Sequence, residues 1–137
     1  MKKVVMFGQF LPPVTGEGVV NDKVKKLMVQ RELDVAVVNS SIITNANSVG
    51  KFSFSKLVRL FTVYTKFRGA LTSADLVYLT PGQTLFGILR LLPILFLCHM
   101  KKTKVIAHWH GYGLLWLFDK HPKIMSYVGR NINHHIF

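Results

Sequence analysis

Short apolar runs alternate along the chain with longer segments that carry apolar residues at helical spacing. Strands are predicted where β-branched and other apolar residues form the short runs, at Lys3–Phe7, Asp34–Val38, Ala74–Leu79 and Lys104–Trp109. Helices are predicted where the apolar residues recur every three or four positions, at Gly16–Glu32, Ser55–Leu71, Leu85–Cys98 and Pro122–Ile132. Thr80 and Pro81 are expected to begin the third helical segment, with threonine as its N-cap.

Strand and helix therefore alternate four times, which is typical of a parallel sheet with right-handed crossovers. The predicted fold class is α/β, a Rossmann-like doubly wound parallel sheet, and residues 1–137 are expected to form a single domain. The pattern stops where a fifth strand would come. We therefore expect part of a domain, or a domain that is short of its usual edge.

Composition narrows the class of protein. Half of the 137 residues are apolar, which argues against disorder. Leu85–Cys98 is the one long apolar run, but it is shorter than the ~20 residues of a spanning helix, and it contains Arg90 and Pro93. We expect a buried or membrane-surface helix there. The only cysteine, Cys98, is expected to be buried, and a chain without a possible internal disulfide fits a reducing compartment. The N-terminus resembles a strand rather than a signal peptide, so export is not expected.

The charge is strongly basic. Lysine and arginine number 18 against six acidic residues, a formal charge of +12. Nucleic acid, anionic lipid and phosphate-bearing substrates all remain open as partners on this ground. The basic residues are spread over several segments, however, and no RNA-binding aromatic motif accompanies them. A specific nucleic-acid partner is therefore not expected.

Two loops carry the candidate chemistry. The first, Gly8–Gly18, leads into a predicted helix, where Gly16 and Gly18 would let backbone amides approach a ligand and the helix N-terminus favours phosphate. Its spacing matches neither the dinucleotide fingerprint nor the P-loop, and the glycines could equally serve a tight turn. The second loop is His110–Gly113. If strand four lies beside strand one, both loops flank the switch point where ligands bind in such sheets.

The second loop follows two histidines at the end of a strand. His108 and His110 are two residues apart, so their side chains point to one side. Two histidines are too few for a zinc site, and no cysteine or carboxylate completes one, so no metal is expected. His108 is expected to be partly buried. His110 leaves the strand beside Gly111, where an imidazole can hydrogen-bond a sugar hydroxyl or a phosphate.

Together the two loops resemble a known family. The segments FGQFLPPVTGEGVVN (residues 7–21), ADLVYLTP (74–81) and KVIAHWHGYG (104–113) are similar to the N-terminal domain of GT-B glycosyltransferases of family four. The resemblance covers nearly the whole chain. It implies retaining transfer of a sugar from a nucleotide-sugar donor to a glycan or lipid-linked acceptor, generally without a metal, in a cleft between two Rossmann-like domains.

The resemblance also implies roles for residues of the two loops. Gly16 and Gly18 would contact the donor diphosphate, with Glu17 as a neighbour, and His110 beside Gly111 would lie near the transferred sugar and its phosphate. Many relatives work at the cytoplasmic face of a membrane. The segments Ser55–Leu71 and Leu85–Cys98 would suit such an anionic surface.

We expect the chain to lack the second, donor-binding domain of that family and therefore to be inactive alone. Two alternatives remain open: a non-catalytic subunit that recruits a partner or a membrane, and a basic nucleotide- or nucleic-acid-binding module.

Overall fold

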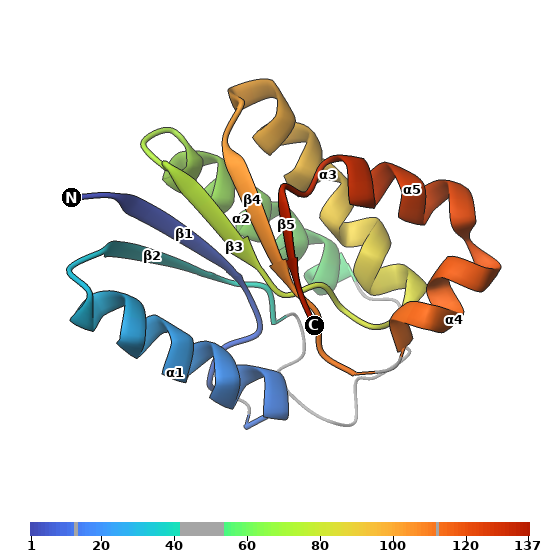
Figure 1. Ribbon diagram of the computed structural model, residues 1–137, viewed down its shortest axis with the longest axis horizontal. Coiled ribbons are helices and arrows are strands. Elements are labelled where there is room, and N and C mark those ends of the chain that lie inside the picture. Colours follow the sequence, from blue (N-terminus) through green and yellow to red (C-terminus); the bar gives the residue numbers. More distant parts are fainter. Residues whose placement is uncertain (13, 42–53, 112) are drawn as a thin grey trace.

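Five parallel strands lie side by side in the order β2-β1-β3-β4-β5 in the computed structural model of the chain (Figure 1). The structure describes residues 1–12, 14–41, 54–111 and 113–137. The strands are β1 (Lys3–Gly8), β2 (Asp34–Asn39), β3 (Leu76–Leu79), β4 (Lys104–His108) and β5 (His134–Ile136). The α/β class and the doubly wound parallel sheet that the sequence predicted are confirmed.

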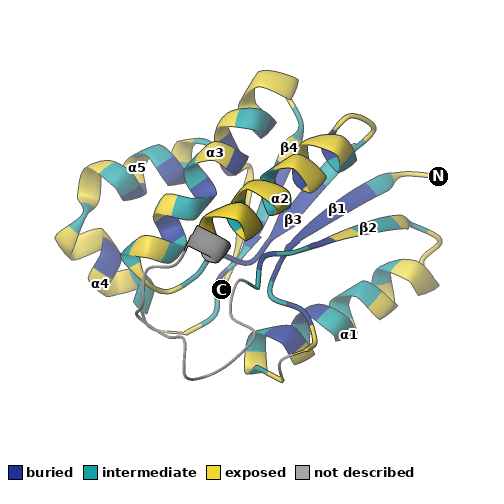
Figure 2. Ribbon diagram, turned by 180° about the vertical axis from the view of Figure 1, so that it is seen from behind, coloured by how far each residue is buried: buried dark blue, intermediate teal, exposed yellow. Residues whose placement is uncertain are grey.

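The helices divide unequally between the two faces of the sheet. They are α1 (Gly16–Gln30), α2 (Phe54–Leu71), α3 (Leu85–Lys101), α4 (Gly113–Lys120) and α5 (Pro122–Arg130). The crossover from β1 to β2 runs in one direction along the sheet, and every later crossover runs in the other. Because parallel crossovers are right-handed, α1 covers one face and the later helices cover the opposite face (Figures 1 and 2).

Each face has its own core. Side chains along β1 point alternately into the two cores. Val5 and Phe7 belong to the larger hydrophobic cluster, and Val4 and Met6 belong to the smaller one. The larger cluster lies under α2, α3, α4 and α5. It includes Cys98, which is 1% exposed as the sequence predicted, and burial raises the pKa of its thiol to about 12. The smaller cluster lies under α1 and includes Tyr78.

Two elements and one neighbour relation differ from the sequence prediction. The chain does form a fifth strand, but β5 has only three residues, all exposed, so no apolar run marks it. Helix α4 was not predicted, since the expected loop ended at Gly113 and the next expected helix began at Pro122. Strand β3, not β4, lies beside β1, because the connection from β2 crosses over β1 to the next free edge.

The start of α3 also differs from the prediction. Thr80 does not cap a helix, because it is buried and its hydroxyl bonds within the site described below. The N-cap is Thr84, whose Oγ1 accepts from the Gly87 amide at 3.1 Å. Across the part of the chain that the structure describes, no helix is both long enough and apolar enough to cross a membrane.

Candidate functional site at the carboxyl edge of the sheet

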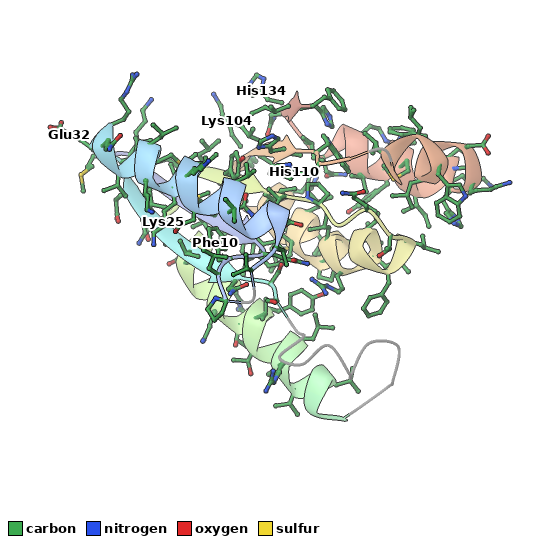
Figure 3. All side chains as sticks on the ribbon, turned by 90° about the horizontal axis from the view of Figure 1, so that it is seen from below. Phe10, Lys25, Glu32, Lys104, His110 and His134 are labelled. Atoms are coloured by element: carbon green, nitrogen blue, oxygen red, sulfur yellow. The ribbon has the colours of Figure 1, made fainter. Side chains whose placement is uncertain are left out.

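The loop after β1 and the first turn of α1 form one side of the candidate site, seen from below in Figure 3. Thr15 is the N-cap of α1, and its Oγ1 accepts from the Gly18 amide at 3.0 Å. The Gly18 amide is therefore already engaged within the chain. Gly16 is exposed, and nothing lies within 4 Å of where its Cβ would be. Of the two glycines predicted to contact diphosphate, Gly16 presents the open approach.

Glu17 ties this loop to the neighbouring strand. Its Oε1 accepts from the Gln9 amide at 3.1 Å and from the Thr80 hydroxyl at 2.7 Å. Asn21 is 1% exposed and donates from Nδ2 to the same Thr80 oxygen at 3.0 Å and to the Gln9 carbonyl at 2.9 Å. The predicted cleft neighbour Glu17 thus holds the β1 loop against the end of β3. Sequence analysis missed Asn21 and misassigned Thr80, because their hydrogen-bond partners are distant in the sequence.

The end of β4 forms the other side of the site. The Tyr78 hydroxyl is hydrogen-bonded to Nδ1 of His108, and the His108 and His110 rings lie 4.2 Å apart between centroids. The Nε2 atom of His110 is buried and has no hydrogen-bond partner among the described residues. A buried polar atom without a partner carries a desolvation cost of roughly 1–3 kcal/mol. A ligand atom that bonds to this nitrogen would remove that cost.

Burial and neighbouring charges set the protonation of this group. Burial and the negative charge of Glu17 raise the pKa of Tyr78 to about 12, so its phenol stays protonated at neutral pH. Burial and the adjacent His110 lower the pKa of His108. A protonated phenol beside a neutral imidazole fits a bond in which Tyr78 donates to His108 Nδ1.

Gly111 shapes the turn that follows His110. Its φ is +79°, a region that other residues rarely adopt. A Cβ there would lie 2.6 Å from the side-chain amide of Gln83 in the loop after β3. The glycine is therefore needed for this turn. Of the predicted loop His110–Gly113, only Tyr112 lies outside the described residues.

Arg90 of α3 is a site residue that sequence analysis noted only as a break in an apolar run. Its guanidinium donates to the Ser40 carbonyl, just after β2, at 3.2 Å, and its Nε is buried without a partner among the described residues. Burial lowers its pKa, while the charges of Tyr64 and Glu17 act in the opposite direction. The signal for it was present, because an arginine inside an apolar helix needs a polar partner.

The structure therefore gathers the predicted residues at one edge but separates them by a strand. Glu17, Gly16 and Gly18 follow β1, and His110 and Gly111 follow β4, with β3 between. The hydrogen bonds of Thr80 to Glu17 and of Tyr78 to His108 join the two sides through β3. No group of three or more potential metal ligands occurs among the residues that the structure describes.

The lowered pKa of His108 predicts how stability depends on pH. Below its ordinary pKa of ~6.5 the unfolded chain binds a proton at this histidine more readily than the folded chain does. The free energy of unfolding should therefore fall as pH drops from 7.5 to 5.5. Urea denaturation measures it at both pH values. His108→Asn keeps an acceptor for Tyr78 but does not titrate, so its pH dependence should be shallower. An equal slope in both proteins would contradict this assignment.

Comparisons with known proteins support the fold and leave the activity open. No protein-family model matches the chain, and no curated protein does. A solved structure, that of a conserved protein from Enterococcus faecalis V583, is similar over 99% of this chain and 91% of that chain. Its TM-score is 0.51 and its sequence identity is 13%, so the likeness concerns the fold alone.

Proposed function

We propose that this chain is the acceptor-side half of a retaining glycosyltransferase, which moves a sugar from a nucleotide-sugar donor to a glycan or lipid-linked acceptor. The observation that carries the proposal is the buried Nε2 of His110 at the carboxyl edge of the sheet, which no described residue contacts by a hydrogen bond. Open parallel sheets bind ligands beyond this edge. The two loops that resemble family-four glycosyltransferases follow β1 and β4, and both lie at this edge of the sheet.

The leaving group of this reaction is a nucleoside diphosphate, on which negative charge builds up as the sugar departs. The exposed start of α1 at Gly16 offers backbone amides and the positive end of a helix dipole to that charge. Arg90 adds a cation whose Nε has no hydrogen-bond partner in the described part of the chain, and His110 offers an imidazole for a sugar hydroxyl or phosphate oxygen. Glu17 acts by fixing the loop that carries Gly16.

The donor nucleotide needs a second binding surface, which we assign to a donor-binding domain or partner chain. Part of the charge stabilisation comes from that half, so this chain alone should have no turnover. We include in the proposal a location at the inner face of the cytoplasmic membrane, as in many glycosyltransferases that the sequence resembles.

Nucleoside diphosphate binding tests the site on the isolated chain. Titration with millimolar uridine, guanosine or adenosine diphosphate should shift the backbone NMR signals of Gly16 and His110. The corresponding nucleosides, which lack phosphate, should not. Arg90→Gln should weaken the binding by roughly tenfold, since charge-assisted hydrogen bonds contribute about 1.5–3 kcal/mol. Shifts confined to the opposite edge, at Lys102, Lys104 or Arg130, would show only attraction to the basic surface and would contradict the proposal.

A further inference from the structure

Helix α3 is apolar on both sides. Its inner side chains, including Ile88, Leu91 and Leu95, are buried in the larger core. A second apolar row runs along its outer side at spacings of three and four residues. This row is called here the outer stripe of α3, and it consists of Phe86, Leu89, Pro93, Phe96 and Met100, all exposed. A helix that contacts only its own core and water needs no such outer row, and large exposed apolar patches mark interaction sites.

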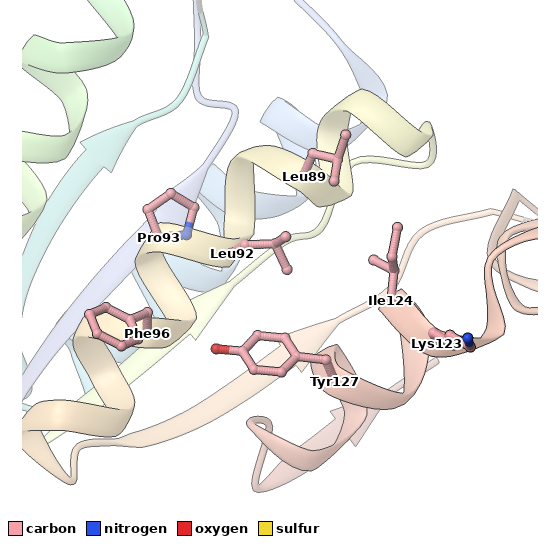
Figure 4. Close-up of a pocket in the computed structure, with 7 residues that line it drawn as sticks. All are labelled: Leu89, Leu92, Pro93, Phe96, Lys123, Ile124 and Tyr127. Atoms are coloured by element: carbon pink, nitrogen blue, oxygen red, sulfur yellow. The ribbon is translucent and has the colours of Figure 1, made fainter.

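The outer stripe continues into a groove shared with α5 (Figure 4). Leu89, Pro93 and Phe96 line it from α3, and Ile124 and Tyr127 line it from α5. Figure 4 shows the Tyr127 ring pointing across the groove toward α3. The groove holds about 690 Å³, and Lys123 is the one charged residue among the described residues that line it.

Helix α4 extends the apolar surface beyond the start of α3. Its first residue, Gly113, packs against the backbone of Gln83, which lies two residues before α3. Figures 1 and 2 both show α4 beside the first turns of α3. Leu115, Trp116 and Phe118 of α4 are 73%, 53% and 48% exposed. Aromatic and aliphatic side chains thus cover neighbouring parts of two helices.

The charges of the chain are segregated in the same way. Helices α2, α3 and α5 carry four, two and two lysine or arginine residues and no acidic residue. Four of the six acidic residues occur in residues 17–34, which include α1 and the start of β2 on the other side of the molecule. Helix α4, which extends the apolar surface, carries one acid, Asp119, beside Lys120. The apolar surface therefore belongs to a layer of helices with a net positive charge.

We propose that the outer stripe of α3, the groove with α5 and the exposed face of α4 dock on an anionic lipid bilayer. Apolar side chains would enter the boundary between headgroups and acyl chains, while Lys123 and its basic neighbours contact acidic headgroups. The inference deepens the membrane location included in the proposed function, but it does not depend on sugar transfer. It also moves the expected contact, because α3 meets the bilayer together with α4 and α5 rather than with the basic helix α2.

Charge and surface chemistry favour a bilayer over other occupants. A second copy of the chain would bring two surfaces of the same positive charge together, within molecules of formal charge +12. Nucleic acid would match the charge, but it offers no apolar phase for Phe86, Phe96 and Trp116. An anionic bilayer offers both.

Vesicle co-sedimentation tests the proposal on the full chain. The protein should bind vesicles of equal parts phosphatidylglycerol and phosphatidylcholine, and it should bind pure phosphatidylcholine at least tenfold more weakly. The double variant Leu89→Ser/Phe96→Ser should weaken binding to the anionic vesicles by tenfold or more. Its matched control is Leu27→Ser/Val29→Ser, which removes two apolar residues of similar exposure from α1. The control should bind within about twofold of the wild type. Thermal melts of both variants check that they fold.

Trp116 provides a direct reading of insertion. Brominated acyl chains should quench its emission when the protein binds vesicles. The control is Trp116→Phe, in which the remaining tryptophan, Trp109, is 8% exposed and should give only background quenching.

The proposal is overturned if the α1 variant loses as much binding as the α3 variant, or if brominated lipid quenches nothing. It is also overturned if light scattering shows that the α3 stripe instead holds a dimer, which Leu89→Ser/Phe96→Ser would dissociate. Vesicle binding without sugar transfer in the reconstituted enzyme would contradict the proposed function and leave this surface standing.

Discussion

Replacing His110 with alanine should lower kcat/KM of the reconstituted transferase by about 100-fold or more, the usual effect of removing a positioned imidazole or an oxyanion donor. The reconstituted enzyme would be this chain together with the donor-binding half that the proposed function requires. The large effect is expected because the Nε2 of His110 is buried and has no partner among the described residues, so a ligand atom is its natural partner. Initial rates at varied donor concentration give the measurement.

The matched control is His99→Ala. His99 is an exposed histidine near the end of α3, at the opposite edge of the sheet, and its loss should leave the rate unchanged. The thermal melting curve of His110→Ala should stay close to that of the wild type, since the imidazole Nε2 bonds to no described residue. Full activity in a folded His110→Ala protein would assign this histidine to packing against His108.

Gly8→Ala should destabilise the fold by roughly 3 kcal/mol, the combined scale of overpacking and of broken buried hydrogen bonds. A Cβ at Gly8 would lie 2.0 Å from Oγ1 of Thr80 and 2.9 Å from Nδ2 of Asn21. It would push apart the Thr80 hydroxyl and its partners Glu17 and Asn21, which join the β1 loop to β3. Urea denaturation at pH 7.5 measures the loss.

Two further variants identify the cause. Gly16→Ala places the same methyl group where nothing lies within 4 Å, at the first residue of a helix, so it should be neutral or slightly stabilising. In a Thr80→Ala background, Gly8→Ala should cost less than in the wild type, because the closest clashing atom is gone. Additive effects of the two substitutions would show that the contact with Thr80 is not the source of the loss.

The sequence predicts the order of the strands along the chain because β1 to β4 are distinct short apolar runs that contain β-branched residues. It does not predict β5, since His134, His135 and Ile136 are exposed on an edge strand and form no buried run. It does not predict α4 either, because Gly111 and Gly113 at its start are typical of a loop and the apolar run that follows them is short. Strand order across the sheet depends on the crossovers, which local sequence does not specify. That is why β3 was not expected between the two candidate loops.

The candidate site was predictable where a residue stands at the end of a strand, as His110 does. Glu17 was expected beside the ligand, but the residues that hold it lie at positions 9 and 80, which only the folded sheet brings together. Arg90 and Tyr78 were missed for a similar reason. Each lies in an apolar segment typical of core, and its role comes from a partner on another element, Ser40 for Arg90 and His108 for Tyr78.

Sugar transfer measured with and without a donor-binding half tests the central claim most directly. Radiolabelled nucleotide sugars, each incubated with a lipid-linked or glycan acceptor, report transfer to product. We expect no product from this chain alone, none from the donor-binding half alone, and turnover from the two together that His110→Ala lowers by ~100-fold. Transfer by the purified chain alone, or turnover by the pair that does not need His110, would contradict the account.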